Sequence, residues 1–413
     1  MIENAYINIF LYVLAIFPVA RSRSLKEARQ TAFSVALLSL AISVACLLFE
    51  KSGNWWAPFP LMVSIIALTA TGLSSLSNTT RRSYAAMLLL SAVSISYLVL
   101  PSGWLLGVPW CTAMLLVWFE VRRRSLKKAR VFAFYMGGST LLAFLGLAFS
   151  GRPEGLLCLA LALGIKEACF PFHSWFPSLV ESTPMGVVVS FVTPQVGVFL
   201  HLKYLAQHLP QSMHLEVATI GIVTALFGAA LASVQTSLKR VLAYLFVSQS
   251  GLVAFGLENS SPIGHTGALT AWLVAGLGMA GFAMSIEALT ARRGSDPDLR
   301  EAGRDFESTP ALATAFMLCG LALVGLPGTL GFVSEDLLVQ GSVQEFPALG
   351  LFLIVVTAIN AITIMKCLFS VFAGPRCEVG EDLTRRERLA LSLVIGTLLL
   401  LGMMPELLLR WFA

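Results

Sequence analysis

Charged residues are scarce in this sequence. Asp, Glu, Lys and Arg make up 12% of its 413 residues, and 57% of the chain is hydrophobic. An ordinary soluble protein is about 45–50% apolar and about a quarter charged. With a mean hydropathy of +0.80, the chain has too little polar surface to cover a water-facing globule of this size. The composition therefore excludes a soluble enzyme and predicts that lipid surrounds most of the chain.

Candidate metal ligands and cofactor motifs are also few. Seven cysteines and five histidines are scattered, with no CxxC pair and no cluster at ligand spacing, so no metal or iron–sulfur site is expected. Gly276, Gly278 and Gly281 match the dinucleotide fingerprint, but no βαβ unit surrounds them, and close helix packing explains them better. No cofactor is therefore predicted, and the net charge of +5 gives no indication of nucleic acid as a partner.

Long apolar stretches bounded by charge, Pro or Gly occur fourteen times along the chain. Since one span needs about 20 residues and its connection about 8 to 10 more, this length accommodates about fourteen spans and no extramembrane catalytic domain. The first stretch lacks a basic n-region and a cleavage motif, so it is expected to be a retained span. The sequence predicts an all-α polytopic membrane protein with spans at 4–20, 30–49, 58–78, 83–100, 102–120, 130–150, 154–172, 184–204, 213–232, 239–257, 262–291, 308–340, 346–372 and 387–411.

Two of these spans carry helix-breaking residues. The stretch 308–340 is too long for one straight helix and contains Pro327 and Gly328, while the seventh span contains Pro171 near its end. The two spans lie five apart, and an odd offset inverts orientation, so the pattern predicts two inverted five-helix repeats with broken helices 7 and 12. The corresponding segments are an N-terminal three-helix segment (1–80), the two repeats (81–206 and 207–375) and a C-terminal helix (376–413).

The basic residues are distributed unevenly among the predicted loops. Of the 28 Lys and Arg residues, 22 lie in or beside the loops that follow odd-numbered spans. Cytoplasmic loops retain positive charge, so both termini are predicted on the non-cytoplasmic side. The expected location is the cytoplasmic (inner) membrane of a prokaryote.

Four charged residues fall within or beside the interrupted spans. Lys166 and Glu167 follow an apolar run, and Glu335 and Asp336 follow the break in span 12. An ionisable group at the centre of a span costs about 2.5–3.5 kcal/mol, so each one indicates a pathway or a buried partner. Neighbouring residues point to different sides of a helix, so Lys166 and Glu167 need separate partners or water. The alternative is that these charges reach an interface from the helix ends.

Two further residues are weaker candidates for proton relay. His173 is the only histidine near the first charged pair, and a loop histidine capping the next span is an equal alternative. Lys239 opens the tenth span, where the positive-inside bias alone could explain it.

Three segments together resemble one family, the antiporter-like membrane subunits of proton-pumping NADH:quinone oxidoreductase, membrane-bound hydrogenases and cation/proton antiporters. The first resembles the family's lysine-bearing helix and its PFH-x-W-x-P stretch, the second its LKR-x-LAYS stretch, and the third its GLPG-x-x-GF-x-x-E stretch. In this chain they read KEACFPFHSWFPSLVESTPMGVVVS (166–190), QTSLKRVLAYLFVSQSG (235–251) and GLPGTLGFVSEDLL (325–338).

The resemblance implies a role for several residues. Lys166 takes the place of the family's central relay lysine, and Glu335 that of the charged residue in the second broken helix. Cys111 stands where the family has a glutamate, and Gln195 falls on or near a lysine position. Glu167 and Asp336 could partly substitute for these groups. The divergent pattern also resembles a branch that accumulates inorganic carbon with a soluble, zinc-containing partner.

Three functions follow as hypotheses. The chain could be a proton-conducting subunit that couples proton flow to a partner's uptake of inorganic carbon. It could instead be an antiporter-like subunit of a respiratory or hydrogenase-type pump, or of a cation/proton antiporter. A third possibility is a membrane anchor without conduction. In each case no catalytic site is expected in this chain, and the expected partners are membrane lipid and at least one other subunit, either zinc-containing or redox-active.

Overall fold

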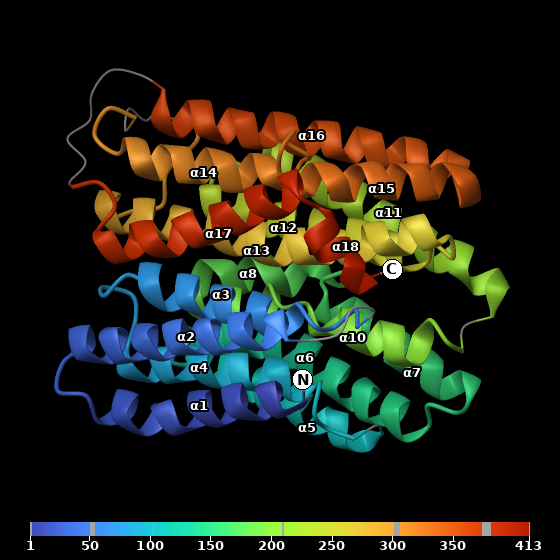
Figure 1. Ribbon diagram of the computed structural model, residues 1–413, viewed down its shortest axis with the longest axis horizontal. Helices are drawn as coiled ribbons and strands as arrows, with labels where there is room; N and C mark the ends of the chain where they lie inside the picture. Colours follow the sequence, from blue (N-terminus) through green and yellow to red (C-terminus); the bar gives the residue numbers. More distant parts are fainter. Residues whose placement is uncertain are drawn as a thin grey trace. The chain divides into compact units, whose positions relative to one another are not determined.

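The structure of this chain is a computed structural model that describes residues 2–49, 54–101, 103–208, 210–300, 306–373 and 381–412. The regular secondary structure of these residues is helical (Figure 1). Two compact units are present, one of Met1–Thr71 with Asn78–Glu216 and the other of Gly72–Ser77 with Val217–Ala413. Lys51, Cys377 and the predicted boundary at 375/376 lie outside the described residues.

The first unit is built from short and long helices in which α1 packs on α2 and α4, α6 on α7, and α4 on α9. Side-chain caps start several of them: Ser24 accepts from the amide of Glu27, and Thr80 forms a capping box with Ser83. Its helices are α1 (Ile2–Arg21), α2 (Leu25–Leu48), α3 (Phe59–Leu73), α4 (Arg81–Ser96), η1 (Trp104–Leu106), α5 (Gly107–Arg122), α6 (Leu126–Ala148), α7 (Pro153–Lys166), η2 (Phe172–Ser174), α8 (Trp175–Ser182), α9 (Met185–Val192), α10 (Val196–Leu200) and η3 (His201–Leu205).

The second unit is arranged around α13, which packs on α12, α14, α15 and α17. The most apolar 18 residues of α13 are all buried. Glycines allow close approach of α11 and α12, since a Cβ at Gly228 would lie 2.5 Å from the backbone nitrogen of Ser248. The helices that follow the first unit are α11 (Gln211–Val234), α12 (Leu238–Leu257), α13 (Pro262–Arg293), α14 (Pro310–Ala322), α15 (Leu330–Glu345), α16 (Pro347–Phe372), α17 (Arg385–Met403) and α18 (Glu406–Phe412).

The all-α membrane fold is confirmed. Within the described residues, eight helices are long and apolar enough to cross a membrane, or nine if α17 and α18 count as one bent span. Shorter apolar helices occur at Ala5–Arg21, Phe59–Leu73 and Pro310–Ala322. The count of fourteen spans, the inverted relation of the repeats and the four predicted segments remain predictions.

Three local features differ from the predicted spans. The stretch after Pro171, expected to be a connection, contains the short helix α8, because its apolar side chains are buried. The predicted span 184–204 is interrupted at Gln195, whose φ of +42° stops α9 from continuing into α10. The predicted span 387–411 bends by 80° between α17 and α18, where Pro405 cannot continue a helix.

Candidate functional site

The first broken helix ends at Lys166. The amide of Cys169 donates to the carbonyl of Gly164 at 2.8 Å, and Ala168 between them has a φ of +56°. This is a left-handed helix cap, a position usually taken by glycine. The chain therefore turns away directly after Lys166 and leaves the lysine on the last turn of α7, where the helix dipole favours a positive charge.

The Lys166 side chain is buried in the first unit, with only 2% of its surface exposed. Its Nζ lies 4.2 Å from the centre of the Phe191 ring and 3.5 Å from the Phe191 carbonyl oxygen. Tyr97, Trp110 and Ser190 line a cavity of about 10 Å³ beside it, which is the order of space that one water molecule needs. A cation–π contact and a backbone carbonyl therefore hold a buried ammonium group next to a small, mostly apolar cavity.

Glu167 has a partner of its own. Its Oε1 accepts a hydrogen bond from the amide of Gly197 at 3.3 Å, at the start of α10. A Cβ at position 197 would lie 2.6 Å from the same oxygen, so only glycine leaves room for the carboxylate. The expectation that Lys166 and Glu167 meet different partners therefore agrees with the observed contacts.

The second broken helix lies in the other unit. The predicted break within 308–340 is confirmed: α14 ends at Ala322, α15 begins at Leu330, and Gly325 and Gly328 have φ values of +71° and +87°. A break frees backbone carbonyls, and Gln249 of α12 donates to one of them, the carbonyl of Leu323, at 3.0 Å.

Glu335 lies against this break. Thr357 of α16 donates to its Oε1 at 3.3 Å, and a Cβ at Gly325 would lie 2.3 Å from its Oε2. Glu335 is partly buried, whereas the adjacent Asp336 is exposed and accepts from Gln340, one turn later, at 2.8 Å. Of the two predicted acids, the one held beside the break is Glu335.

The remaining predicted residues take no part in the contacts of Lys166 and Glu335 described above. His173 in η2 is half-buried, and its ring stacks on Phe170 at 6.2 Å. Lys239 is half-buried in the first turn of α12, after the capping residue Ser237. Pro171 precedes η2, and Pro327 is exposed within the second break. Their predicted roles remain predictions.

Several buried polar residues were not predicted from the sequence. Asn360 of α16 donates to Ser248 of α12 at 2.8 Å, one residue before Gln249, and both side chains of this bond are fully buried. Glu258 and Glu287 are buried acids with 1% and 2% of their surfaces exposed. Asn360 and Glu287 each interrupt an apolar run, a signal that could have identified both.

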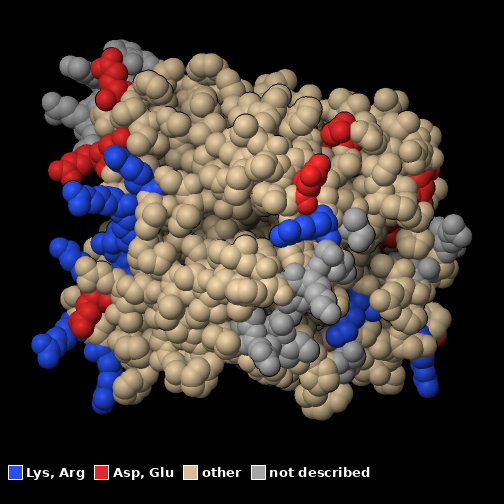
Figure 2. Space-filling view, in the orientation of Figure 1, with Lys and Arg blue, Asp and Glu red and all other residues tan. Residues whose placement is uncertain are grey.

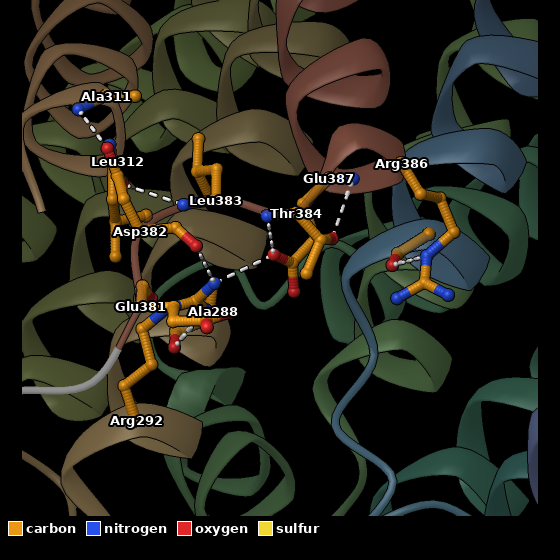
Figure 3. Close-up of polar contacts among 11 residues, drawn as sticks. Ala288, Arg292, Ala311, Leu312, Glu381, Asp382, Leu383, Thr384, Arg386 and Glu387 are labelled. Carbon is orange, nitrogen blue, oxygen red and sulfur yellow. Dashed lines mark hydrogen bonds and ion pairs between the residues drawn. The ribbon is translucent and has the colours of Figure 1, made fainter.

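A polar cluster joins distant segments of the second unit (Figure 3). Arg292, at the end of α13, forms an ion pair with Glu387 at 2.8 Å and donates to the carbonyl of Glu381. The carboxylate of Asp382 accepts from two amides at the start of α14, at 2.9 and 3.2 Å. These contacts satisfy helix ends and indicate a structural role. Among the described residues, no three His, Cys, Asp or Glu side chains are grouped as metal ligands.

Comparison with known proteins places these sites in a family. Residues 130–361 match the family model described as NADH:quinone oxidoreductase/Mrp antiporter, transmembrane. The chain is 32% identical over 253 residues to NADH-quinone oxidoreductase subunit M of Mycobacterium tuberculosis, covering 59% of this chain and 46% of that protein. It is 30% identical over 302 residues to NADH-quinone oxidoreductase subunit N 2 of Acidobacterium capsulatum, covering 67% and 60%. The chain thus spans about half the length of the curated relatives it matches.

Solved structures share the fold. A chain of respiratory complex I from Thermus thermophilus superposes with a TM-score of 0.89 at 20% identity, covering 99% of this chain and 97% of that one. A chain of the Mrp complex from a Dietzia species gives a TM-score of 0.86 at 16% identity, covering 100% and 96%.

Proposed function

We propose a function for this chain from the premise that it belongs to the NADH:quinone oxidoreductase/Mrp antiporter family of transmembrane proteins. The chain is an integral membrane protein that conducts protons as one subunit of a larger complex. The observation that carries this proposal is the burial of Lys166 at the end of a broken helix, beside a small cavity. A buried ionisable group at such a position is a functional candidate because its insertion is costly.

In this proposal each unit supplies half of a relay. Lys166 and Glu167 accept and release protons in the first unit, and Glu335 does so in the second. The polar side chains Ser248, Gln249 and Asn360 support the second half, since they provide hydrogen-bonding groups in a buried part of the same unit. Lys239, His173 and Asp336 remain candidates for proton relay. Residues 81–206 and 207–375 remain the proposed repeats.

The relatives' names support a partner complex, since two of them are subunits of NADH-quinone oxidoreductase. We propose that this chain likewise works with at least one other subunit in a prokaryotic inner membrane, with both termini on the non-cytoplasmic side. A more specific proposal is that the chain takes part in inorganic-carbon uptake with a zinc-containing partner. It is motivated by the replacement of relay groups at Cys111 and Gln195. Purification of the complex decides it: a zinc-bearing partner supports carbon uptake, and flavin or iron–sulfur subunits contradict it.

Proton flux through the full chain in liposomes, followed with a pH-sensitive dye, tests conduction directly. Lys166→Ala should lower the flux by about a hundredfold, because proton transfer by a positioned group contributes roughly that factor. Glu335→Gln should lower it as well. Lys127→Ala is the control, since Lys127 is exposed on α6. Equal background flux in the wild type and all variants would contradict conduction and support the membrane-anchor alternative.

A further inference from the structure

A second cavity lies in the first unit, apart from Lys166. It has a volume of about 790 Å³ and is formed by α1, α4, α5 and the start of α6. This volume is in the range of sites for small organic molecules. None of its lining residues takes part in the relay proposed above, so it calls for a different explanation.

The rim of this cavity is basic. Arg82 in the first turn of α4 and Arg122 and Arg123 at the end of α5 line it, with Glu120 as the only acid among its lining residues. Glu120 is already engaged, since it lies 3.6 Å from Arg123 and accepts from Ser83 at 3.0 Å. Among the described residues, Arg82 and Arg122 form no ion pair, and Arg122 instead lies over the Trp118 ring at 4.9 Å. The guanidinium groups of Arg82 and Arg122 are therefore available to bind an anion.

The wall of the cavity is apolar. Leu89 lies seven residues beyond Arg82 on α4, and Leu116 lies seven residues before Arg123 on α5. At 1.5 Å per residue, the apolar wall extends about 10 Å from the charged rim along both helices. Phe119, also part of the lining, is 53% exposed. A charged rim above an apolar wall of this depth is complementary to an amphiphile with an anionic head and a hydrocarbon chain.

The basic rim agrees with the charge distribution of this unit. Figure 2 shows Lys and Arg side chains, with fewer Asp and Glu, at the lower left, where Figure 1 places the turn from α1 to α2. Basic pockets between membrane helices on the cytoplasmic side are suited to anionic lipid head groups.

We propose that this cavity binds one anionic phospholipid, with its phosphate held by Arg82 and Arg122 and an acyl chain along Leu89, Leu116 and Phe119. The lipid is favoured over free phosphate because the apolar wall is the larger part of the lining. The proposal does not depend on proton conduction.

Lipid binding to the purified full chain, measured by native mass spectrometry, tests the charged rim. Phosphatidylglycerol should be retained and phosphatidylcholine should not. Arg82→Gln with Arg122→Gln should weaken phosphatidylglycerol binding by about thirtyfold, since two basic contacts are lost. Arg385→Gln with Arg388→Gln, two exposed arginines of α17, should leave it unchanged. Equal loss in both double variants, or equal binding of the two lipids, would overturn the proposal.

The apolar wall and the identity of the occupant need separate variants. Ala85→Trp would fill the cavity, because half-buried Ala85 lines it, and should abolish retention without removing any charge. Unchanged retention in this variant would place the lipid elsewhere. A photoreactive side chain at position 119, activated in the membrane, should label phospholipid. Labelling of a polypeptide instead would identify a partner helix as the occupant and exclude the lipid.

Discussion

Lys166 lies over the face of an aromatic ring, and this contact has a measurable consequence. A desolvated cation–π interaction contributes about 2 kcal/mol. Because the Phe191 ring lies 4.2 Å from Nζ, the ring both stabilises and positions the ammonium group. Phe191→Leu should therefore reduce proton flux by up to about thirtyfold, and Phe191→Trp, which keeps an aromatic face, should retain most of it.

A matched control separates positioning from packing. Phe132 is buried and packs its ring on Phe191 and Trp175. Phe132→Leu should lower thermal stability about as much as Phe191→Leu, since both remove a buried ring, yet leave the flux near that of the wild type. If the two variants lose flux equally, Phe191 acts only through packing.

Some residues of the two sites could be predicted from the sequence, and others could not. The positions of Lys166 and Glu335 beside helix breaks were predictable, because charge after Gly and Pro in an apolar run is visible in the sequence. The partners Phe191, Gly197 and Thr357 were not, since they come from other helices and offer no charge pattern of their own.

Among the elements, the break between α14 and α15 depends on one glycine. Gly325 has a φ of +71°, and a Cβ there would lie 2.3 Å from the Glu335 carboxylate. Gly325→Ala should lower the free energy of unfolding by about 1–2 kcal/mol from the backbone conformation alone. It should also displace the carboxylate and reduce proton flux.

Gly396 in α17 provides the opposite case. Nothing lies within 4 Å of a Cβ at this helical position, so Gly396→Ala should raise the free energy of unfolding by about 0.5–1 kcal/mol. Both variants can be compared by denaturant unfolding in detergent. A Gly325→Ala variant as stable and as active as the wild type would show that Glu335 does not need this geometry.

Most errors in the predicted spans are interruptions or bends within a single span. Hydropathy identified apolar stretches, but it did not detect the interruption at Gln195 or the 80° bend before α18. Pro194, directly before Gln195, was a visible signal for the interruption. Pro405 was a visible signal for the bend.

Across whole units, long-range polar contacts join helices that are distant in sequence. The Arg292–Glu387 pair of the second unit has side chains that are 13% and 11% exposed. A double-mutant cycle with Arg292→Ala and Glu387→Ala should give a coupling energy of about 1–3 kcal/mol, typical of paired groups in one network.

The exposed pair Lys128–Glu181 is the matched comparison, with a similar distance of 3.1 Å but side chains that are 33% and 28% exposed. Its coupling energy should stay below about 1 kcal/mol because solvent screens it. Equal coupling energies in the two cycles would show that burial does not strengthen the Arg292 pair.

The sequence by itself determined the membrane environment, the helical class, the two helix breaks and the family, because these follow from composition, from Gly and Pro positions and from short motifs. Only the tertiary structure decided which groups surround Lys166 and Glu335, and that a basic rim meets an apolar cavity at Arg82 and Arg122. The physical reason is that contacts and cavities form between the side chains of different helices. Hydropathy instead describes each helix alone, and in a protein this apolar it varies little between buried and lipid-facing surfaces.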